Sequence, residues 1–291
     1  MRILLAPLLI LLLTASALYA QTPKEYPGAT TYKYKTVGDT ELYLFVFLPE
    51  DHKPTDSRPA AVFFFGGSWN GGTPTQFIPH CRHLAQRGMV AITADYRVKT
   101  RQGTSPRECV KDGKSAVRWV RINAAKLGID PDRIAAGGGS AGGHVASTTG
   151  IIRGLEEAGE DLTVSSKPNA LLLFNPVYDN GPGGYGHDRV KNYYKEISPI
   201  HNIQKGAPPT IVFLGTDDKL IPVSTAHKFQ ALMDKAKVRC VHHFYEGEPH
   251  GFFNYAKKAN FIDTVTKMDQ FLQELSWIQG PANLNYEAVK P

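Results

Sequence analysis

Short, wholly apolar runs alternate with segments of helical periodicity along most of this 291-residue chain. Runs of this kind indicate strands buried on both faces of a parallel sheet, and the helical segments between them would cross over its faces. Strands are expected at 60–65, 89–94, 134–136, 170–174, 210–214 and 239–245, after a hairpin of 31–37 and 41–48, and helices at 76–87, 106–127, 142–149, 223–236 and 262–277. The pattern predicts an α/β fold with a mostly parallel sheet flanked by helices.

The N-terminus has the features of a targeting segment. Arg2 precedes the apolar run 3–13, and small residues follow that allow cleavage after Ala17 or after Ala20. A membrane anchor needs about 20 apolar residues, more than this run supplies. We therefore expect 1–20 to be a signal peptide, the protein to be secreted or periplasmic, and no stable membrane insertion.

No internal repeat or linker divides the rest of the chain, which predicts a single folded domain over 31–280. A polar tether is expected at 21–30 and a loose C-terminal tail at 281–291. The segment 175–209 is rich in Gly, Pro, Asn and Tyr and has no clear periodicity. Loops of that length inside a compact domain are usually functional, so we expect this insertion to lie over the active site.

Charge and cysteine usage limit the classes of partner and scaffold. The formal net charge is +6, and the sequence contains no Lys/Arg-rich block, so no nucleic-acid partner is expected. In an oxidising compartment two of the three cysteines could form a bridge. Because Cys81 and Cys109 each belong to an expected helix, we predict a Cys81–Cys109 disulfide and a buried free thiol at Cys240. Three reduced thiols remain the alternative. No feature of the sequence indicates an oligomeric state.

A glycine-rich hexapeptide carries the strongest chemical signal in the sequence. Residues 138–143 read Gly-Gly-Ser-Ala-Gly-Gly and lie between a short apolar strand and a helix. The G-x-S-x-G pattern serves a sharp strand-to-helix turn that projects the serine hydroxyl from the top of a sheet. A serine is a weak nucleophile on its own and needs a base that a carboxylate orients. Ser140 is the predicted nucleophile.

The partners of such a serine follow it in the order acid, then histidine, each after a later strand. Asp217 and Asp218 come directly after the run 210–214, and His250 lies in a Pro/Gly loop after 239–245. His250 is the last of ten histidines. We therefore predict a triad of Ser140, Asp218 and His250, with Asp217 as the alternative acid.

An oxyanion hole needs backbone N–H groups aimed at the developing negative charge. The N–H of Ala141, just after the nucleophile, is one expected donor. The others are expected from the loop after strand 60–65, which reads Gly66-Gly67-Ser68-Trp69. Glycine at such a strand end lets the backbone approach a ligand closely.

Taken together, these motifs resemble the α/β-hydrolase superfamily, in particular secreted bacterial esterases near the hormone-sensitive-lipase and carbohydrate-esterase (acetylxylan and feruloyl esterase) groups. The HGGGW-type oxyanion motif of that family matches 65–69, its elbow 138–142, its acid loop 215–222 and its histidine loop 249–251. The resemblance covers nearly all of the chain after the signal segment. It implies the α/β-hydrolase fold and adds Gly67 and Ser68 to Ala141 as oxyanion donors.

The chain departs from the family motif at two positions of the oxyanion loop. Phe65 stands where the leading histidine is usual, which removes a hydrogen bond that braces the loop, and Ser68 replaces the last glycine. Backbone donors survive both changes, so the implied reaction remains ester hydrolysis through an acyl-enzyme. No metal or organic cofactor is expected. His80 and His83 share an (i, i+3) helix face but have no third ligand motif, so we interpret them as helix-surface residues.

The substrate is predicted from the insertion. Its Tyr178 and Tyr185, with Trp69 of the oxyanion motif, are expected to contact a small-molecule or polysaccharide ester. A polar aromatic mix favours a small acyl group, such as acetyl, on a carbohydrate or similar polar alcohol. The alternatives are a short-chain lipase-like esterase, a serine peptidase of the prolyl-oligopeptidase type, for whose N-terminal propeller we expect no room, and a binding module that has kept the fold.

Overall fold

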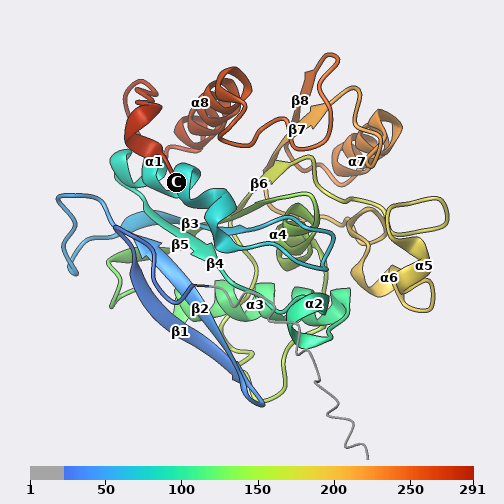
Figure 1. The fold of residues 1–291 in the computed structure, drawn as a ribbon, viewed down its shortest axis with the longest axis horizontal. Coiled ribbons are helices and arrows are strands. Elements are labelled where there is room, and N and C mark those ends of the chain that lie inside the picture. The colour runs from blue at the N-terminus through green and yellow to red at the C-terminus, as the bar shows by residue number, and fades with distance from the viewer. Residues whose placement is uncertain (1–22) are drawn as a thin grey trace, which may run out of the picture.

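The structure is a computed structural model that describes residues 23–291 (Figure 1). The signal peptide expected at 1–20, with its cleavage after Ala17 or Ala20, lies outside the described residues. Within 23–291 one sheet of eight strands runs in the order β1-β2-β4-β3-β5-β6-β7-β8. The strands are β1 Thr30–Val37, β2 Thr40–Phe47, β3 Arg58–Phe64, β4 Val90–Ala94, β5 Ile129–Gly139, β6 Ala170–Phe174, β7 Thr210–Gly215 and β8 Cys240–Tyr245.

The predicted α/β-hydrolase architecture is confirmed. The β1–β2 and β2–β4 pairs are antiparallel, and every later pair in the sheet is parallel. The expected run 134–136 is only part of β5, which also includes Ile129, the more exposed residues 130–133 and the buried glycines 137–139. Where parallel strands end, their carboxyl ends lie at the same edge of the sheet, and that edge carries the site described below.

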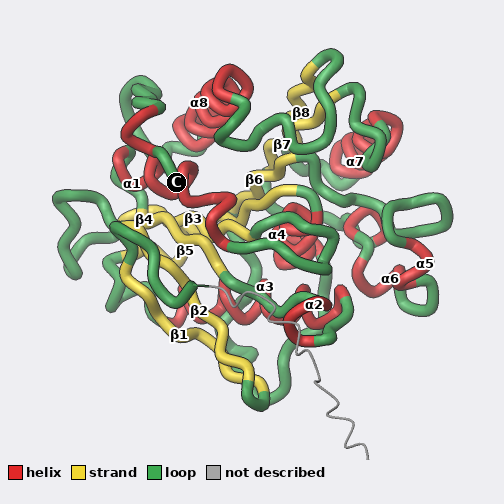
Figure 2. The backbone as a smooth tube through the Cα atoms, viewed as in Figure 1, coloured by secondary structure: helices red, strands yellow, loops and turns green. Residues whose placement is uncertain are grey.

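Helices cover both faces of the sheet, as Figure 2 shows with helices in red and strands in yellow. One apolar cluster joins α1 and α8 to one face, and a second joins α3, α4 and α7 to the other. The helical elements are η1 Pro74–Phe77, α1 Ile78–Gln86, α2 Lys99–Gln102, α3 Pro106–Ile122, α4 Ala141–Ile151, α5 His187–Val190, α6 Tyr194–Ile197, η2 Pro199–His201, α7 Val223–Lys235, α8 Lys258–Glu274 and η3 Glu287–Val289. No helix in the described part of the chain combines the length and apolar content needed to cross a membrane.

The predicted Cys81–Cys109 disulfide is wrong. Cys81, on α1, belongs to the apolar cluster on one face of the sheet, whereas Cys109, on α3, belongs to the cluster on the opposite face. Both are free thiols, and the Cys109 thiol donates instead to the carbonyl oxygen of Arg97 at 3.1 Å. Cys240 is also free, but it is only partly buried.

His80 and His83 are not helix-surface residues, because both are fully buried. The imidazole of His80 packs edge-on against Phe174 and Phe261, and burial, with His83 beside it, lowers the pKa of His80 to about 3. His83 Nε2 lies 3.0 Å from Asp269 Oδ2 on α8. Their side of α1 therefore packs into the core beneath α8.

Two segments expected to be irregular are more ordered than predicted. The insertion 175–209 contains the short helices α5, α6 and η2. The C-terminal segment 281–291 is not a loose tail, because Val289 is fully buried and the Tyr286 ring stacks on Tyr255 at 4.3 Å. Apolar contacts therefore hold the last residues against α1 and α8.

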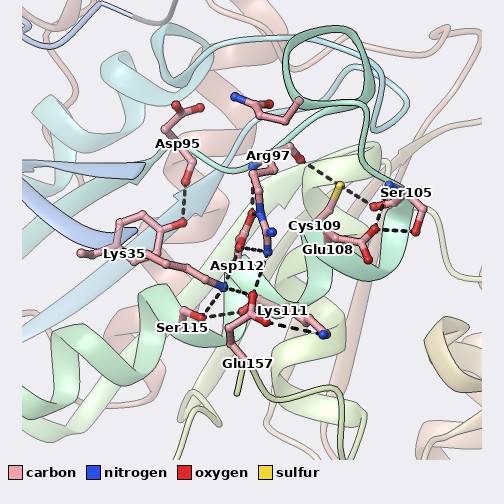
Figure 3. Close-up of polar contacts among 12 residues, drawn as sticks. Lys35, Asp95, Arg97, Ser105, Glu108, Cys109, Lys111, Asp112, Ser115 and Glu157 are labelled. Carbon is pink, nitrogen blue, oxygen red and sulfur yellow. Dashed lines mark hydrogen bonds and ion pairs between the residues drawn. The ribbon is translucent and has the colours of Figure 1, made fainter. Parts of the chain in front are cut away.

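A buried ion cluster fastens β1 to α3 on the other face of the sheet (Figure 3). Asp112 accepts hydrogen bonds from the Arg97 guanidinium at 2.7 and 2.8 Å, and Lys35 Nζ lies 2.7 Å from its carboxylate. Glu157 pairs with the same two cations at 2.9 and 2.8 Å. The Asp112 side chain is 0% exposed, so these partners replace the water it gives up on folding.

Candidate active site

Ser140 lies on a sharp turn between β5 and α4. Its backbone has φ 54° and ψ −120°, a strained conformation for a residue with a side chain. Small neighbours make the turn possible: a side chain at Gly142 would collide with the carbonyl oxygens of Phe64 and Phe65. The Ser140 N–H donates to the carbonyl oxygen of Phe174 at the end of β6, at 2.9 Å. The strand-to-helix geometry that the glycine pattern predicts is present.

The structure brings Ser140, His250 and Asp218 into one hydrogen-bonded chain. His250 Nε2 lies 2.9 Å from Ser140 Oγ, and His250 Nδ1 lies 2.7 Å from Asp218 Oδ2. The other carboxylate oxygen of Asp218 accepts from the backbone N–H groups of Leu220 and Ile221 at 2.8 and 3.0 Å. Because a carboxylate only accepts, Nδ1 carries the proton and Nε2 is free to accept one from Ser140.

Asp217, the alternative acid, is placed elsewhere. Its side chain is 52% exposed and pairs with Lys219, whereas the side chain of Asp218 is 0% exposed. The side chain of His250 is 23% exposed, so the base lies between the buried acid and the solvent.

The oxyanion loop, residues 66–69, packs directly on the elbow. A Cβ added at Gly66 would lie 3.0 Å from the carbonyl oxygen of Gly139 and 3.3 Å from Ser140 Cβ. Gly67, Ser68 and Trp69 follow with φ values of 127°, 59° and 58°, three consecutive residues in the left-handed region. Such conformations are unfavourable for residues with a side chain and need support from the surroundings.

That support comes largely from hydrogen bonds. The Gly67 carbonyl oxygen accepts from the N–H groups of Asn70 and Gly71 at 2.9 and 3.2 Å. Trp69 Nε1 donates to His144 Nδ1 at 3.2 Å, and His144 Nε2 in turn donates to the carbonyl oxygen of Ile197 at 2.8 Å. Burial lowers the pKa of His144 to about 4, although the bond to the Ile197 carbonyl opposes this, so His144 stays neutral and can accept from the indole.

Two family descriptions cover most of the chain. Residues 44–177 match BD-FAE, and residues 183–280 match the dienelactone hydrolase family. The apo form of esterase 2 from the planctomycete Thermogutta terrifontis is 45% identical, with a TM-score of 0.86 over 89% of this chain and 99% of that one. Its propionate-bound form is 44% identical, with a TM-score of 0.84 over 87% and 97% of the two chains. The chain belongs to the α/β-hydrolase esterases.

Curated relatives agree at lower identity. A probable carboxylic ester hydrolase, LipM, from Mycobacterium tuberculosis is 29% identical over 80% of this chain, and esterase LipC from the same organism is 28% identical over 74%. This chain spans 58% of the length of each of these two proteins. The matches indicate that this chain falls in the hormone-sensitive-lipase-like group.

The insertion 175–209 contacts the oxyanion loop. The Tyr185 hydroxyl lies 2.5 Å from Ser68 Oγ, and Arg189 Nη1 donates to the Ser68 carbonyl oxygen at 2.8 Å. The Arg189 guanidinium also lies 5.4 Å from the centre of the Trp69 ring. The insertion therefore contacts both the hydroxyl and the carbonyl oxygen of Ser68. These contacts fix the loop whose N–H groups are the expected oxyanion donors.

Tyr178 and Trp69 do not line the site as predicted. Tyr178 is fully buried, packs against Phe229 and forms a 3.1 Å hydrogen bond with His242, so its hydroxyl points into the core. Trp69 is 1% exposed, so its side chain supports the loop from the interior of the protein. Of the three predicted substrate contacts, only Tyr185 is partly exposed beside the oxyanion loop.

The sequence analysis missed Asn175, which lies at the end of β6 beside the triad of Ser140, Asp218 and His250. It is fully buried, has φ 34°, and its Oδ1 accepts from the Gly251 N–H at 2.9 Å. Its amide nitrogen lies 3.5 Å from His250 Nε2. The signal that could have found it is its position: a polar residue directly after a buried parallel strand lies at the edge that carries the site.

No group of three or more His, Cys, Asp or Glu side chains within 23–291 is arranged to hold a metal ion. The expectation that the reaction needs no metal or organic cofactor stays a prediction.

Proposed function

We propose that the protein is a serine carboxylic-ester hydrolase that acts through an acyl-enzyme on Ser140. The observation that carries the proposal is the continuous chain from Ser140 Oγ through His250 to the buried carboxylate of Asp218. Two neighbouring structures support it: esterase 2 of T. terrifontis is phosphorylated by paraoxon in one and phosphonylated by sarin in the other. These organophosphorus esters are attacked by an activated nucleophile.

The chemistry follows from the placement of the protons. His250 Nε2 takes the proton of Ser140 as Oγ attacks the ester carbonyl, and the N–H groups of Gly67, Ser68 and Ala141 receive the oxyanion. Asp218 stabilises the imidazolium that forms. When the tetrahedral intermediate collapses, His250 gives its proton to the leaving alcohol. Water, deprotonated by His250, then releases the acid and restores Ser140.

The proposed substrate is an ester of a small acyl group and a polar alcohol, for example an acetylated carbohydrate, as a small molecule or a polysaccharide. Support for a small acyl group comes from propionate-bound and butyrate-bound structures of esterase 2. Support for a polar alcohol comes from the polar groups at the oxyanion loop, namely the hydroxyls of Ser68 and Tyr185 and the guanidinium of Arg189.

A panel of acyl lengths and carriers tests the substrate. We expect p-nitrophenyl acetate and butyrate to be hydrolysed faster than the octanoate, and acetylated xylan to release acetate. A higher kcat/KM for octanoate than for acetate would instead favour the lipase-like alternative. Acetate release from the nitrophenyl ester but not from acetylated xylan would contradict the proposal that the alcohol is a carbohydrate.

Replacing the nucleophile tests the reaction itself. We expect Ser140→Ala to lower kcat by at least about 10⁴-fold. Without the nucleophile, only the part of the rate enhancement that comes from the oxyanion hole and substrate binding is left. Ser147→Ala is the matched control: Ser147 lies on α4, the helix that follows Ser140, and its hydroxyl donates to the carbonyl oxygen of His144 at 2.9 Å. Ester turnover that survives Ser140→Ala would exclude the proposed mechanism.

We also propose export to the periplasm or the medium, on the charge and apolar pattern of residues 1–20. The test is the N-terminal sequence of protein recovered from those fractions. A mature chain that begins at Leu18 or Gln21 would support the proposal, whereas an intact N-terminus in the cytosol would refute it.

A further inference from the structure

A row of side-chain amides connects the oxyanion loop with the segment 249–254, which begins with the histidine loop 249–251. The Gly66 N–H donates to Gln76 Oε1 at 2.6 Å, and Gln76 Nε2 donates to Asn254 Oδ1 at 2.9 Å. Asn254 Nδ2 then donates to the carbonyl oxygen of Gly251 at 2.7 Å. Gly251 follows His250 directly, so three hydrogen bonds span the distance from an oxyanion-loop residue to the neighbour of the base.

The backbone groups at the two ends fix the direction of every bond in this row. An N–H only donates, so the oxygen of Gln76 must face Gly66 and its nitrogen must face Asn254. A carbonyl oxygen only accepts, so the nitrogen of Asn254 must face Gly251. Neither amide can flip without losing both of its bonds. Hydrogen bonds that run in one direction through partly buried groups also strengthen one another.

Gln76 supplies the contact that the chain loses at Phe65. The Phe65 ring stacks on Tyr96 at 4.1 Å, and the Tyr96 hydroxyl donates to the Phe65 carbonyl oxygen at 2.6 Å. The Phe65 side chain has no polar atom with which to brace the oxyanion loop. The Gly66 N–H, next in the chain, is instead held by Gln76 from η1, which lies outside the loop.

The histidine loop is also held from its other side. The Gly251 N–H donates to Asn175 Oδ1 at 2.9 Å, while the Gly251 carbonyl oxygen accepts from Asn254. Asn175 is anchored to the sheet, because its own N–H donates to the carbonyl oxygen of Phe213 at 2.7 Å. The residue after His250 is thus fixed to the sheet by Asn175 and to η1 by Asn254 and Gln76.

We propose that Gln76 and Asn254 form a strut that sets the distance between the oxyanion donors and His250, and that both are positioning residues. Ester hydrolysis needs these two groups at once, the donors at the carbonyl oxygen and His250 at Ser140 Oγ. A misplacement of about 1 Å costs on the order of 10²-fold in rate, so a direct tie between the two loops has value for catalysis. The inference rests on the proposed function.

The test removes each half of the strut with side chains of similar size. Gln76→Met and Asn254→Leu are expected to lower kcat by about 10- to 100-fold and to change KM by less than about 2-fold, because geometry in the transition state is lost while ground-state binding is kept. The double variant should lose no more than the worse single variant, because the strut breaks only once. Gln273→Met, which removes an amide bonded to Asp269 at 2.6 Å on α8, is the matched control.

Two further measurements separate positioning from mere stability. Counting reactive serines by the p-nitrophenol burst with paraoxon expresses kcat per competent site, so a partly unfolded sample does not imitate the effect. Asn254→Asp, which still accepts from Gln76, should keep more of kcat than Asn254→Leu on the pH-independent plateau. A transition-state analogue such as a trifluoromethyl ketone should lose affinity in parallel with kcat/KM.

The outcomes distinguish the strut from the mechanism beneath it. An unchanged kcat per site in Gln76→Met and Asn254→Leu, with Ser140→Ala inactive, would overturn the strut alone. Losses that multiply in the double variant would show two independent roles and would also overturn it. Activity that survives Ser140→Ala would instead refute the proposed function.

Discussion

Asp112 and Asp218 both have side chains that are completely shielded from water, and they are satisfied in opposite ways. Asp112 is surrounded by permanent cations: Arg97 and Lys35 both lie within 3 Å of it. Within residues 23–291, Asp218 pairs with no lysine or arginine and instead accepts from two backbone N–H groups and one imidazole. The first arrangement joins β1 to α3, and the second leaves a histidine able to take and return a proton.

The comparison shows what a buried carboxylate needs for each task. Permanently charged cations hold a buried carboxylate in its paired, hydrogen-bonded geometry, which suits a structural joint. Backbone dipoles keep a carboxylate ionised without competing for the imidazolium that appears during turnover. The two regions should therefore fail differently when each carboxylate is made neutral.

The largest effect is expected at Asp218. Asp218→Asn should lower kcat by about 10⁴-fold, because an amide can donate to Nδ1 and so favours the wrong tautomer of His250. The Tm should change little, since the packing is kept. Asp217→Asn, at the exposed neighbouring carboxylate, is the control and should leave kcat unchanged. Equal losses in the two variants would contradict the assignment of the acid.

Asp112→Asn should show the reverse pattern. It removes one of the two carboxylates that pair with Arg97 and Lys35. Breaking a buried pair on one side costs about 3–5 kcal/mol in the free energy of unfolding. Denaturant titration measures the loss, and kcat per titrated serine should stay within about 2-fold because the cluster touches no triad residue. Asp263→Asn, which breaks a partly exposed pair with Lys267, should cost only about 0–1 kcal/mol. Equal costs for the two substitutions would show that the buried cluster has no special role.

The pH dependence of stability should show the ion cluster through Glu157. Burial alone raises the pKa of Glu157, but its hydrogen bond and ion pair with Lys35, together with Lys111 and Arg97, lower the pKa to about 2. Because the folded-state pKa lies below the unfolded value, this stabilisation is present above about pH 4.5 and is lost as the pH falls towards 2.

Glu157→Gln should accordingly flatten the fall in unfolding free energy between pH 5 and 3, as measured by urea titration at each pH. Glu287→Gln, in an exposed pair with Lys258, is the control and should leave the slope unchanged. An identical acid slope in wild type and Glu157→Gln would contradict the pKa of Glu157.

The smallest expected effect is that of a reductant, which should be none. Cys109 lies beside the ion cluster and Cys81 lies across the sheet from it, so there is no bridge to cleave. Dithiothreitol should leave the Tm unchanged, and all three thiols should react with Ellman's reagent after unfolding without reduction. Fewer than three reactive thiols would reveal a disulfide that the fold does not accommodate.

Local pattern was enough to predict most of the fold and the chemically reactive residues. The positions of the strands along the chain, the elbow and the order acid then histidine all follow from short motifs, because each depends on neighbours in sequence. The Cys81–Cys109 error has a different origin: both residues lie on helices, but sequence spacing does not say which face of the sheet each helix covers. The inward orientation of Tyr178 was not predicted either, because the sequence of a polar loop does not show which way a tyrosine side chain points.

Other residues escaped prediction because their partners are remote in sequence. Gln76 and Asn254 are separated by 178 positions and meet only in the folded chain. His80 was misread because a polar residue on a helix suggests a solvent face, whereas here it packs among phenylalanines. Asn175 carried a positional signal that periodicity alone does not register.

The distance along the chain between Ser140 and His250 has a consequence in time. They are 110 residues apart, and β6, β7 and β8 must all pair before the hydroxyl and the imidazole can meet. Contacts of such long range form slowly, since much loop entropy is lost before they are made. A refolding chain would recover its helical signal first and its hydrolytic activity last, so that enzymatic activity marks the completion of the sheet.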